Sequence, residues 1–124
     1  MALKSYRELE VWRKGMDLVV AVYEATAELP DREQYGLTAQ IRRAAVSVPS
    51  NIAEGQGRKS TLEFKRHLSI ALGSLNEVET CLYLAERLDL VAHAHAESLL
   101  GQCAELGRMI NGLHAKLLSV RQLA

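Results

Sequence analysis

Residues 60–85 read STLEFKRHLSIALGSLNEVETCLYLA, and the spacing of their apolar residues decides the fold. These residues recur at alternating intervals of four and three, and they are Phe64, Leu68, Ala71, Leu75, Val78, Leu82 and Ala85. Unbroken 4–3 spacing places one apolar stripe along a helix and is typical of helices that pack at shallow angles in bundles. Ser60 and Glu63 have the spacing of a capping box, which predicts that the helix begins there.

The same spacing recurs on both sides of this stretch. Downstream it is carried by Leu99, Cys103, Leu106, Ile110, Leu113, Leu117 and Val120. Upstream, residues 37–54 place on one face Leu37, Ile41, Ala44 or Ala45, Val48 and Ile52. A further helix is predicted to begin at a Ser5–Glu8 capping box and to stop at Pro30. We therefore predict an all-α fold with a single domain over residues 1–124, an up-down-up-down antiparallel four-helix bundle whose connections lie near residues 30–36, 55–60 and 88–92.

The first predicted helix carries two apolar stripes. One consists of Leu9, Trp12, Met16, Val19 and Tyr23, and the other of Val11, Leu18, Val22 and Leu29. We expect the second stripe to have no partner inside a four-helix bundle. Because an exposed apolar stripe usually marks an interface, this pattern predicts self-association.

Pro49 falls inside the second predicted helix. Its ring displaces the carbonyl of Ala45, and it offers no backbone N–H group. We predict a continuous helix over residues 37–54 that is kinked at Pro49, with the hydroxyls of Ser47 and Ser50 bonding the backbone groups that the kink frees.

The sequence contains no motif of a known catalytic or cofactor site, such as HExxH, a P-loop, GxGxxG or GxSxG. His93 and His95 would point about 200° apart on a helix, so they would not share a metal ion, and a His93–Glu97 pair lacks further ligands. Cys81 and Cys103 are expected to be buried free thiols. We predict no catalytic residue, no cofactor and no metal.

No segment of the sequence predicts export or membrane insertion. The first residues lack an apolar signal core, and no run approaches 18 apolar residues. We therefore expect a cytoplasmic protein that does not associate with a membrane.

Charge is unevenly distributed, although the net charge is zero. Residues 42–66 hold six Arg or Lys against two Glu, a net charge of +4, whereas residues 67–105 carry −5. A helix start with free N–H groups attracts anions, and here it is flanked by cations and hydroxyls. The candidate phosphate-binding residues are Arg42, Arg43, Arg58, Lys59, Ser60, Thr61, Lys65 and Arg66. The alternative interpretation is an ordinary helical turn with a solubilising basic rim.

Four stretches together resemble one family: SYRELEVWRKGMDLVVAVY (5–23), YGLTAQIRRAAVSVPSNIAEGQGRKS (35–60), FKRHLSIALGSLNEVET (64–80) and NGLHAKL (111–117). The chain resembles the four-helix-bundle proteins from intervening sequences of bacterial 23S ribosomal RNA genes, whose fold is shared by the accessory variability proteins of diversity-generating retroelements. The resemblance implies a homopentamer without known enzymatic activity. For the retroelement relatives it implies a basic surface that binds nucleic acid and a partner reverse transcriptase. The basic positions that match the family motif are Arg42, Arg43, Arg58 and Lys59.

Two functions follow as predictions. The first is a non-enzymatic, homo-oligomeric adaptor, pentameric by resemblance, that contacts RNA or DNA phosphates through the basic residues. The second is a protein–protein interaction scaffold without a nucleic-acid ligand, whose basic residues pair with an acidic partner.

Overall fold

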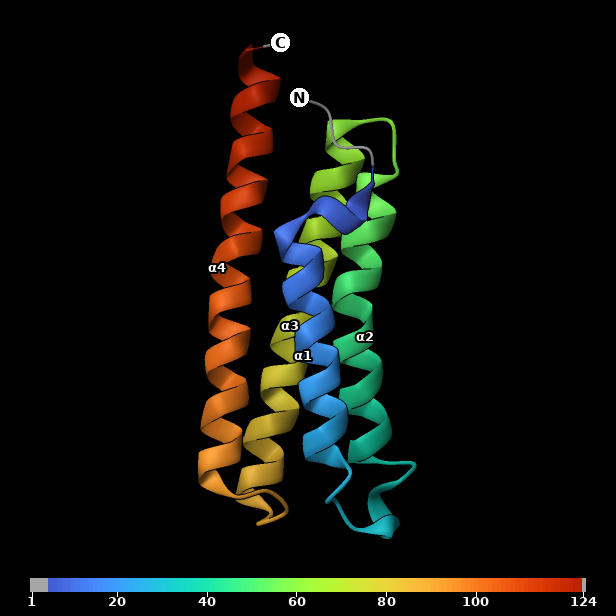
Figure 1. Ribbon diagram of the computed structural model, residues 1–124, viewed down its shortest axis with the longest axis vertical. Coiled ribbons are helices and arrows are strands. Elements are labelled where there is room, and N and C mark those ends of the chain that lie inside the picture. The colour runs from blue at the N-terminus through green and yellow to red at the C-terminus, as the bar shows by residue number, and fades with distance from the viewer. Residues whose placement is uncertain (1–4, 124) are drawn as a thin grey trace.

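The computed structural model describes the backbone of residues 5–123 and the side chains of residues 5–117, and over that range it is helical without strands. Its four long helices are α1 (Glu10–Thr26), α2 (Leu37–Gln56), α3 (Thr61–Arg87) and α4 (His93–Leu123). The helices lie alongside one another, and the chain reverses direction at each connection (Figure 1). The predicted all-α four-helix bundle is confirmed.

The helices follow one another around the bundle in chain order. α2 and α3 pack together most extensively, α1 packs on α2 and α4, and α4 packs on α3. α1 therefore lies diagonally opposite α3, and α2 lies opposite α4. In Figure 1, α4 extends beyond the start of α1 toward the end of the bundle where α2 and α3 are joined.

The 4–3 stripes of α2, α3 and α4 form the core, as predicted. On α3 every stripe residue from Leu68 to Ala85 is buried, and Phe64 at its start is half-buried. The stripe of α2 meets it with Ile41, Val48 and Ile52, and the stripe of α4 contributes Leu99, Cys103, Leu106 and Ile110. Leu113 and Leu117 are half-buried, and the side chain of Val120 lies outside the described residues.

The prediction for the two stripes of α1 is wrong. Val11, Leu18 and Val22, which were expected to lack a partner, are buried in the core. Met16 and Tyr23 of the other stripe are 42% and 43% exposed, and Val20 beside them is 55% exposed. The reason is geometric. α1 packs on both α2 and α4, and the face that it buries is the one that lies between these two helices.

The predicted bounds of the first helix also need correction. Ser5 caps only a 3₁₀ turn over Tyr6–Glu8, its hydroxyl accepting from the Arg7 N–H at 3.2 Å, and Leu9 then adopts an extended conformation. The helix ends at Thr26, before Pro30. The Ala27 N–H closes the last turn on the Tyr23 carbonyl at 3.1 Å, and the Thr26 hydroxyl donates back to the Val22 carbonyl at 2.7 Å.

α2 runs without interruption through Pro49, as predicted, and a kink at Pro49 stays a prediction. The proline is buried against α1, where the facing residue is Gly15. A Cβ atom on Gly15 would lie 3.3 Å from the Pro49 Cβ, so the absence of a side chain lets the two helices approach closely.

Both ends of α3 are capped, and the cap at its start is the predicted one. The Ser60 hydroxyl accepts from the Glu63 N–H at 3.0 Å and starts α3. At the other end Asp89 adopts a left-handed conformation (φ 56°), and the Leu90 N–H bonds the Ala85 carbonyl at 2.8 Å. This pattern of bonds terminates a helix and turns the chain into α4.

Among the described residues, none of the helices combines the length and the apolar character that a membrane span requires.

Candidate nucleic-acid interface

The eight predicted phosphate-binding residues fall into two groups in the structure. Arg42 and Arg43 lie on α2, whereas the others lie on the α2–α3 turn and the first two turns of α3. The stretch of α2 between the groups spans about 20 Å at 1.5 Å per residue, so they form two sites and no single pocket. We call the cations of the second group the basic end: Arg58, Lys59, Lys65 and Arg66.

The basic end contains both paired and unpaired cations. Arg58 bonds Glu54 at 2.9 Å, and Arg66 lies 3.4 Å from Glu63. Both pairs are exposed and join residues three or four apart in the sequence, and such pairs contribute about 0–1 kcal/mol. Lys59 and Lys65 have no acidic partner within the part of the chain that the structure describes.

Ser60 and Thr61 are placed at the start of α3 as predicted, with one difference in role. The Ser60 oxygen accepts the capping bond from the Glu63 N–H, and its hydroxyl hydrogen is the part that can still be donated to a phosphate. Thr61 is half-buried. One N–H group of the helix start is therefore satisfied internally, by the capping bond that the sequence predicted.

Arg42 contributes to the joint between α1 and α2. Its Nε donates to the Thr26 Oγ1 at 2.8 Å, and its Nη2 donates to the Tyr23 carbonyl at 3.3 Å. Its guanidinium group also lies over the Tyr23 ring, 4.4 Å from the centroid. These contacts hold the guanidinium plane in one orientation and use two of its five N–H groups.

Both arginines line a groove on the outside of α2, which we call the α2 groove. It has a volume of about 660 Å³, and its walls are Tyr23, Gln34, Tyr35, Thr38, Ala39, Arg42, Arg43, Val46 and Ser47. None of these residues is acidic. Arg43 is exposed and has no ion pair among the described residues, and Tyr35 is 89% exposed.

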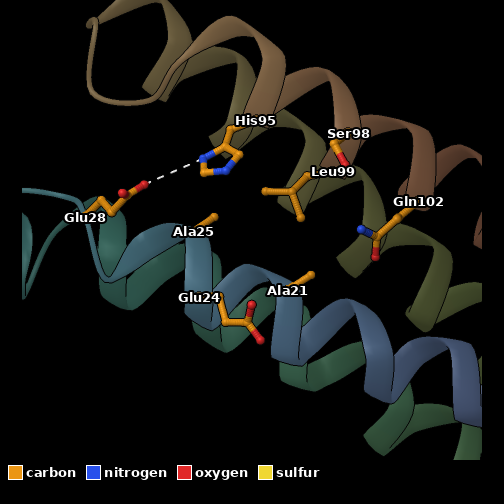
Figure 2. A pocket seen from close by; sticks show the side chains of 8 residues that line it. All are labelled: Ala21, Glu24, Ala25, Glu28, His95, Ser98, Leu99 and Gln102. Atoms are coloured by element: carbon orange, nitrogen blue, oxygen red, sulfur yellow. Dashed lines mark ion pairs between the residues drawn. The ribbon is translucent and has the colours of Figure 1, made fainter.

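A second cleft, between α1 and α4, has the opposite character. Its volume is about 410 Å³, and its lining includes the carboxylates of Glu24 and Glu28. Figure 2 shows Glu28, in the turn after α1, and His95 of α4 pointing toward one another, and their ion pair measures 3.6 Å. Two carboxylates would repel a phosphate, so this cleft is a poor candidate for binding nucleic acid.

A polar network between α2 and α3 supports the region between the two basic groups. The Asn51 amide donates to the Ser47 hydroxyl at 3.0 Å, and that hydroxyl bonds Ser74 at 2.8 Å. Asn51 Oδ1 accepts from Nδ1 of the buried His67 at 3.1 Å. The predicted role of Ser47 is therefore wrong, because its hydroxyl reaches across to α3 and does not satisfy the backbone beside Pro49.

Neither cysteine forms a disulfide, and His93 is paired with carboxylates. Cys81 and Cys103 are buried and free, and burial raises the pKa of Cys103 to about 12, with Glu79 adding to the shift. His93 bonds Glu86 and lies 3.9 Å from Glu97. Among the described residues no group of three or more potential ligands could hold a metal ion.

Sequence reasoning missed Tyr23 and Tyr35 as parts of a candidate site. Tyr23 follows the other apolar residues of its helix at helical spacing, which predicts a place in an apolar stripe. In the structure its side chain is 43% exposed. Tyr35 offered a detectable signal, since a large aromatic residue stands between Gln34 and Gly36 in a polar connection. Aromatic residues in such turns have no core to enter and are candidates for contacts with a ligand.

Comparisons with known proteins agree with this architecture. The model of the family described as 23S rRNA-intervening sequence protein matches residues 7–112. A crystal structure of a protein of unknown function from the S23 ribosomal protein family of Bacteroides thetaiotaomicron has a similar fold, with a TM-score of 0.79 and 24% identity over 85% of this chain and 95% of that chain. No curated protein matches the chain. Because the family model covers most of its length, the chain belongs to the family of 23S rRNA-intervening sequence proteins.

Proposed function

We propose that this protein is a non-enzymatic, self-associating helical bundle that binds the phosphate backbone of RNA or DNA through its basic end. The observation that carries the proposal is the state of the four cations there. Lys59 and Lys65 lack acidic partners among the described residues, and the ion pairs of Arg58 and Arg66 are exposed. A phosphate can replace such a carboxylate at little cost, because exposed ion pairs are weak. Binding would release counterions and would depend strongly on salt.

Charge reversal tests this proposal. The double variant Arg58→Glu, Lys59→Glu should lower the affinity for a labelled 20-nucleotide RNA or DNA at least tenfold, measured by fluorescence anisotropy at 50 mM salt. The matched control is Arg87→Glu, Arg108→Glu, which reverses two exposed arginines, one at the end of α3 and one on α4, that belong neither to the basic end nor to the α2 groove. The control should bind as the wild type does. Equal affinities of both variants and the wild type would contradict the proposal.

Self-association is supported by the outer face of α1. Met16 and Val20 lie one turn apart there, and they are 42% and 55% exposed. Covering these side chains with another copy would remove apolar surface from water. The resemblance to pentameric relatives makes five copies of the 13.7 kDa chain the expected assembly.

Light scattering on Val20→Glu tests the assembly. The variant should dissociate, whereas the control Leu84→Glu, an exposed apolar residue on α3, should keep the mass of the wild type. A wild-type monomer would contradict the proposed assembly. If the Arg58→Glu, Lys59→Glu variant dissociates in the same measurement, the basic end binds the acidic segment, residues 67–105, of a neighbouring copy, as in the scaffold alternative. A partner such as a reverse transcriptase would then be sought at another surface.

A further inference from the structure

We infer that the α2 groove binds unpaired bases, so that the preferred nucleic acid of this protein is single-stranded. The inference rests on the proposed function and narrows it to one class of ligand. The observation behind it is that two tyrosines and two arginines line one groove and that no carboxylate does. The basic end has no such combination of aromatic rings and cations.

The tyrosines offer stacking surfaces. Tyr35 is 89% exposed at one edge of the groove, and Tyr23, 43% exposed at another, offers the ring face that the Arg42 guanidinium does not cover. Proteins that bind single strands combine a positive groove with exposed aromatic rings, and removing one such ring lowers affinity by about 5- to 150-fold. Duplex DNA or RNA keeps its bases stacked inside the helix and cannot use these rings.

The arginines supply the matching polar contacts. The contacts of Arg42 with Tyr23 and Thr26 fix its guanidinium plane, which leaves three N–H groups for a base edge or a phosphate. Arg43 is exposed beside it without an ion pair in the described chain. A flat, oriented guanidinium group is itself a platform on which bases stack.

Charge and position favour a nucleic acid over a second copy of the chain. The groove carries two positive charges and no negative ones, whereas the cleft between α1 and α4 contains two carboxylates. Neither Met16 nor Val20, the residues proposed for self-association, lines the groove. A strand that occupies the groove can also continue along α2 toward the basic end, about 20 Å away.

Fluorescence anisotropy with a 20-nucleotide single strand and the duplex of the same sequence tests the inference. Tyr35→Ala should weaken binding of the single strand at least fivefold and leave binding of the duplex unchanged. The slope of affinity against salt should not move, because no charge is removed. Tyr35→Phe should retain the affinity of the wild type, and so should the control Tyr83→Ala, which removes a tyrosine that is 56% exposed on α3.

Three results would overturn the inference. If Tyr35→Ala leaves single-strand affinity unchanged while Arg58→Glu, Lys59→Glu abolishes it, the basic end binds alone and the proposed function survives. If Tyr35→Ala changes the mass of the assembly in light scattering, the groove contacts a second copy. If the wild type binds neither strand form, the proposed function fails as well. Tyr35 is almost fully exposed, so replacing it should not disturb the fold. The circular dichroism spectrum and the unfolding midpoint of the Tyr35→Ala variant should therefore match those of the wild type, which excludes misfolding.

Discussion

Two glycines set how closely α2 packs on its neighbours. Gly15 of α1 faces Pro49, and Gly55 near the end of α2 faces His67 of α3. A Cβ atom on Gly55 would lie 2.6 Å from the His67 Cβ and 3.1 Å from Phe64 Cδ1. The stretch from Ser47 to Gly55 thus contains a proline that packs on one neighbouring helix and an asparagine and a glycine that pack on the other.

The Gly55→Ala variant tests this close packing. A helical alanine is intrinsically better than glycine by about 1 kcal/mol, but the clash with the Cβ of His67 should outweigh that gain and destabilise the fold by about 1–3 kcal/mol. Urea unfolding followed by circular dichroism measures the difference. Gly73→Ala is the matched control, because its Cβ would meet nothing within 4 Å, and it should be neutral or stabilising. A stabilised Gly55→Ala variant would show that α2 and α3 are not packed so closely.

At the scale of the helices, the sequence predicted α2, α3 and α4 because each carries one apolar stripe with one possible orientation. α1 carries two, and only the positions of α2 and α4 decide which is buried. Its length was also mispredicted: Leu9 is extended, and at the other end Arg42 of α2 bonds the Thr26 hydroxyl and the Tyr23 carbonyl, contacts that a helical pattern does not reveal. Periodicity therefore identifies a helix more reliably than it orients one that has neighbours on two sides.

The connection between α3 and α4 contains a contact that depends on pH. His93 at the start of α4 bonds Glu86 in the last turns of α3, and this hydrogen bond raises the pKa of His93, with the negative charges of Glu86 and Glu97 adding to the shift. Since the folded pKa lies above the unfolded value of about 6.5, the stabilisation is complete below that value and is lost as the pH rises through the folded pKa.

We therefore expect His93→Gln to lower the thermal unfolding midpoint at pH 5.5 and to leave it unchanged at pH 9. Thermal unfolding of both proteins across this range measures the effect. The control is His114→Gln, which removes a half-buried histidine elsewhere on α4. Adding His93→Gln to this control should lower the midpoint at pH 5.5 as much as it does in the wild type. A midpoint difference that grows with pH would contradict the assignment.

At the scale of the whole molecule, charge separates along and around the bundle. The basic end lies where α2 joins α3, the α2 groove carries two further arginines, and the cleft between α1 and α4 is acidic. The sequence identified these cations as one set, because charge can be counted along a chain, and their binding of phosphate stays a prediction. It did not predict their division into a weakly paired end and a groove with two tyrosines, since the ring over Arg42 comes from α1 and Tyr35 comes from a connection.

The central claim, that the protein binds the phosphate backbone through the basic end, is tested most directly by the salt dependence of wild-type binding. Anisotropy titrations of a labelled single strand between 50 and 300 mM salt give the slope of log affinity against log salt concentration. If the four cations of the basic end each meet a phosphate, the slope should be about −3. A slope near zero, or no binding at 50 mM salt, would contradict the claim.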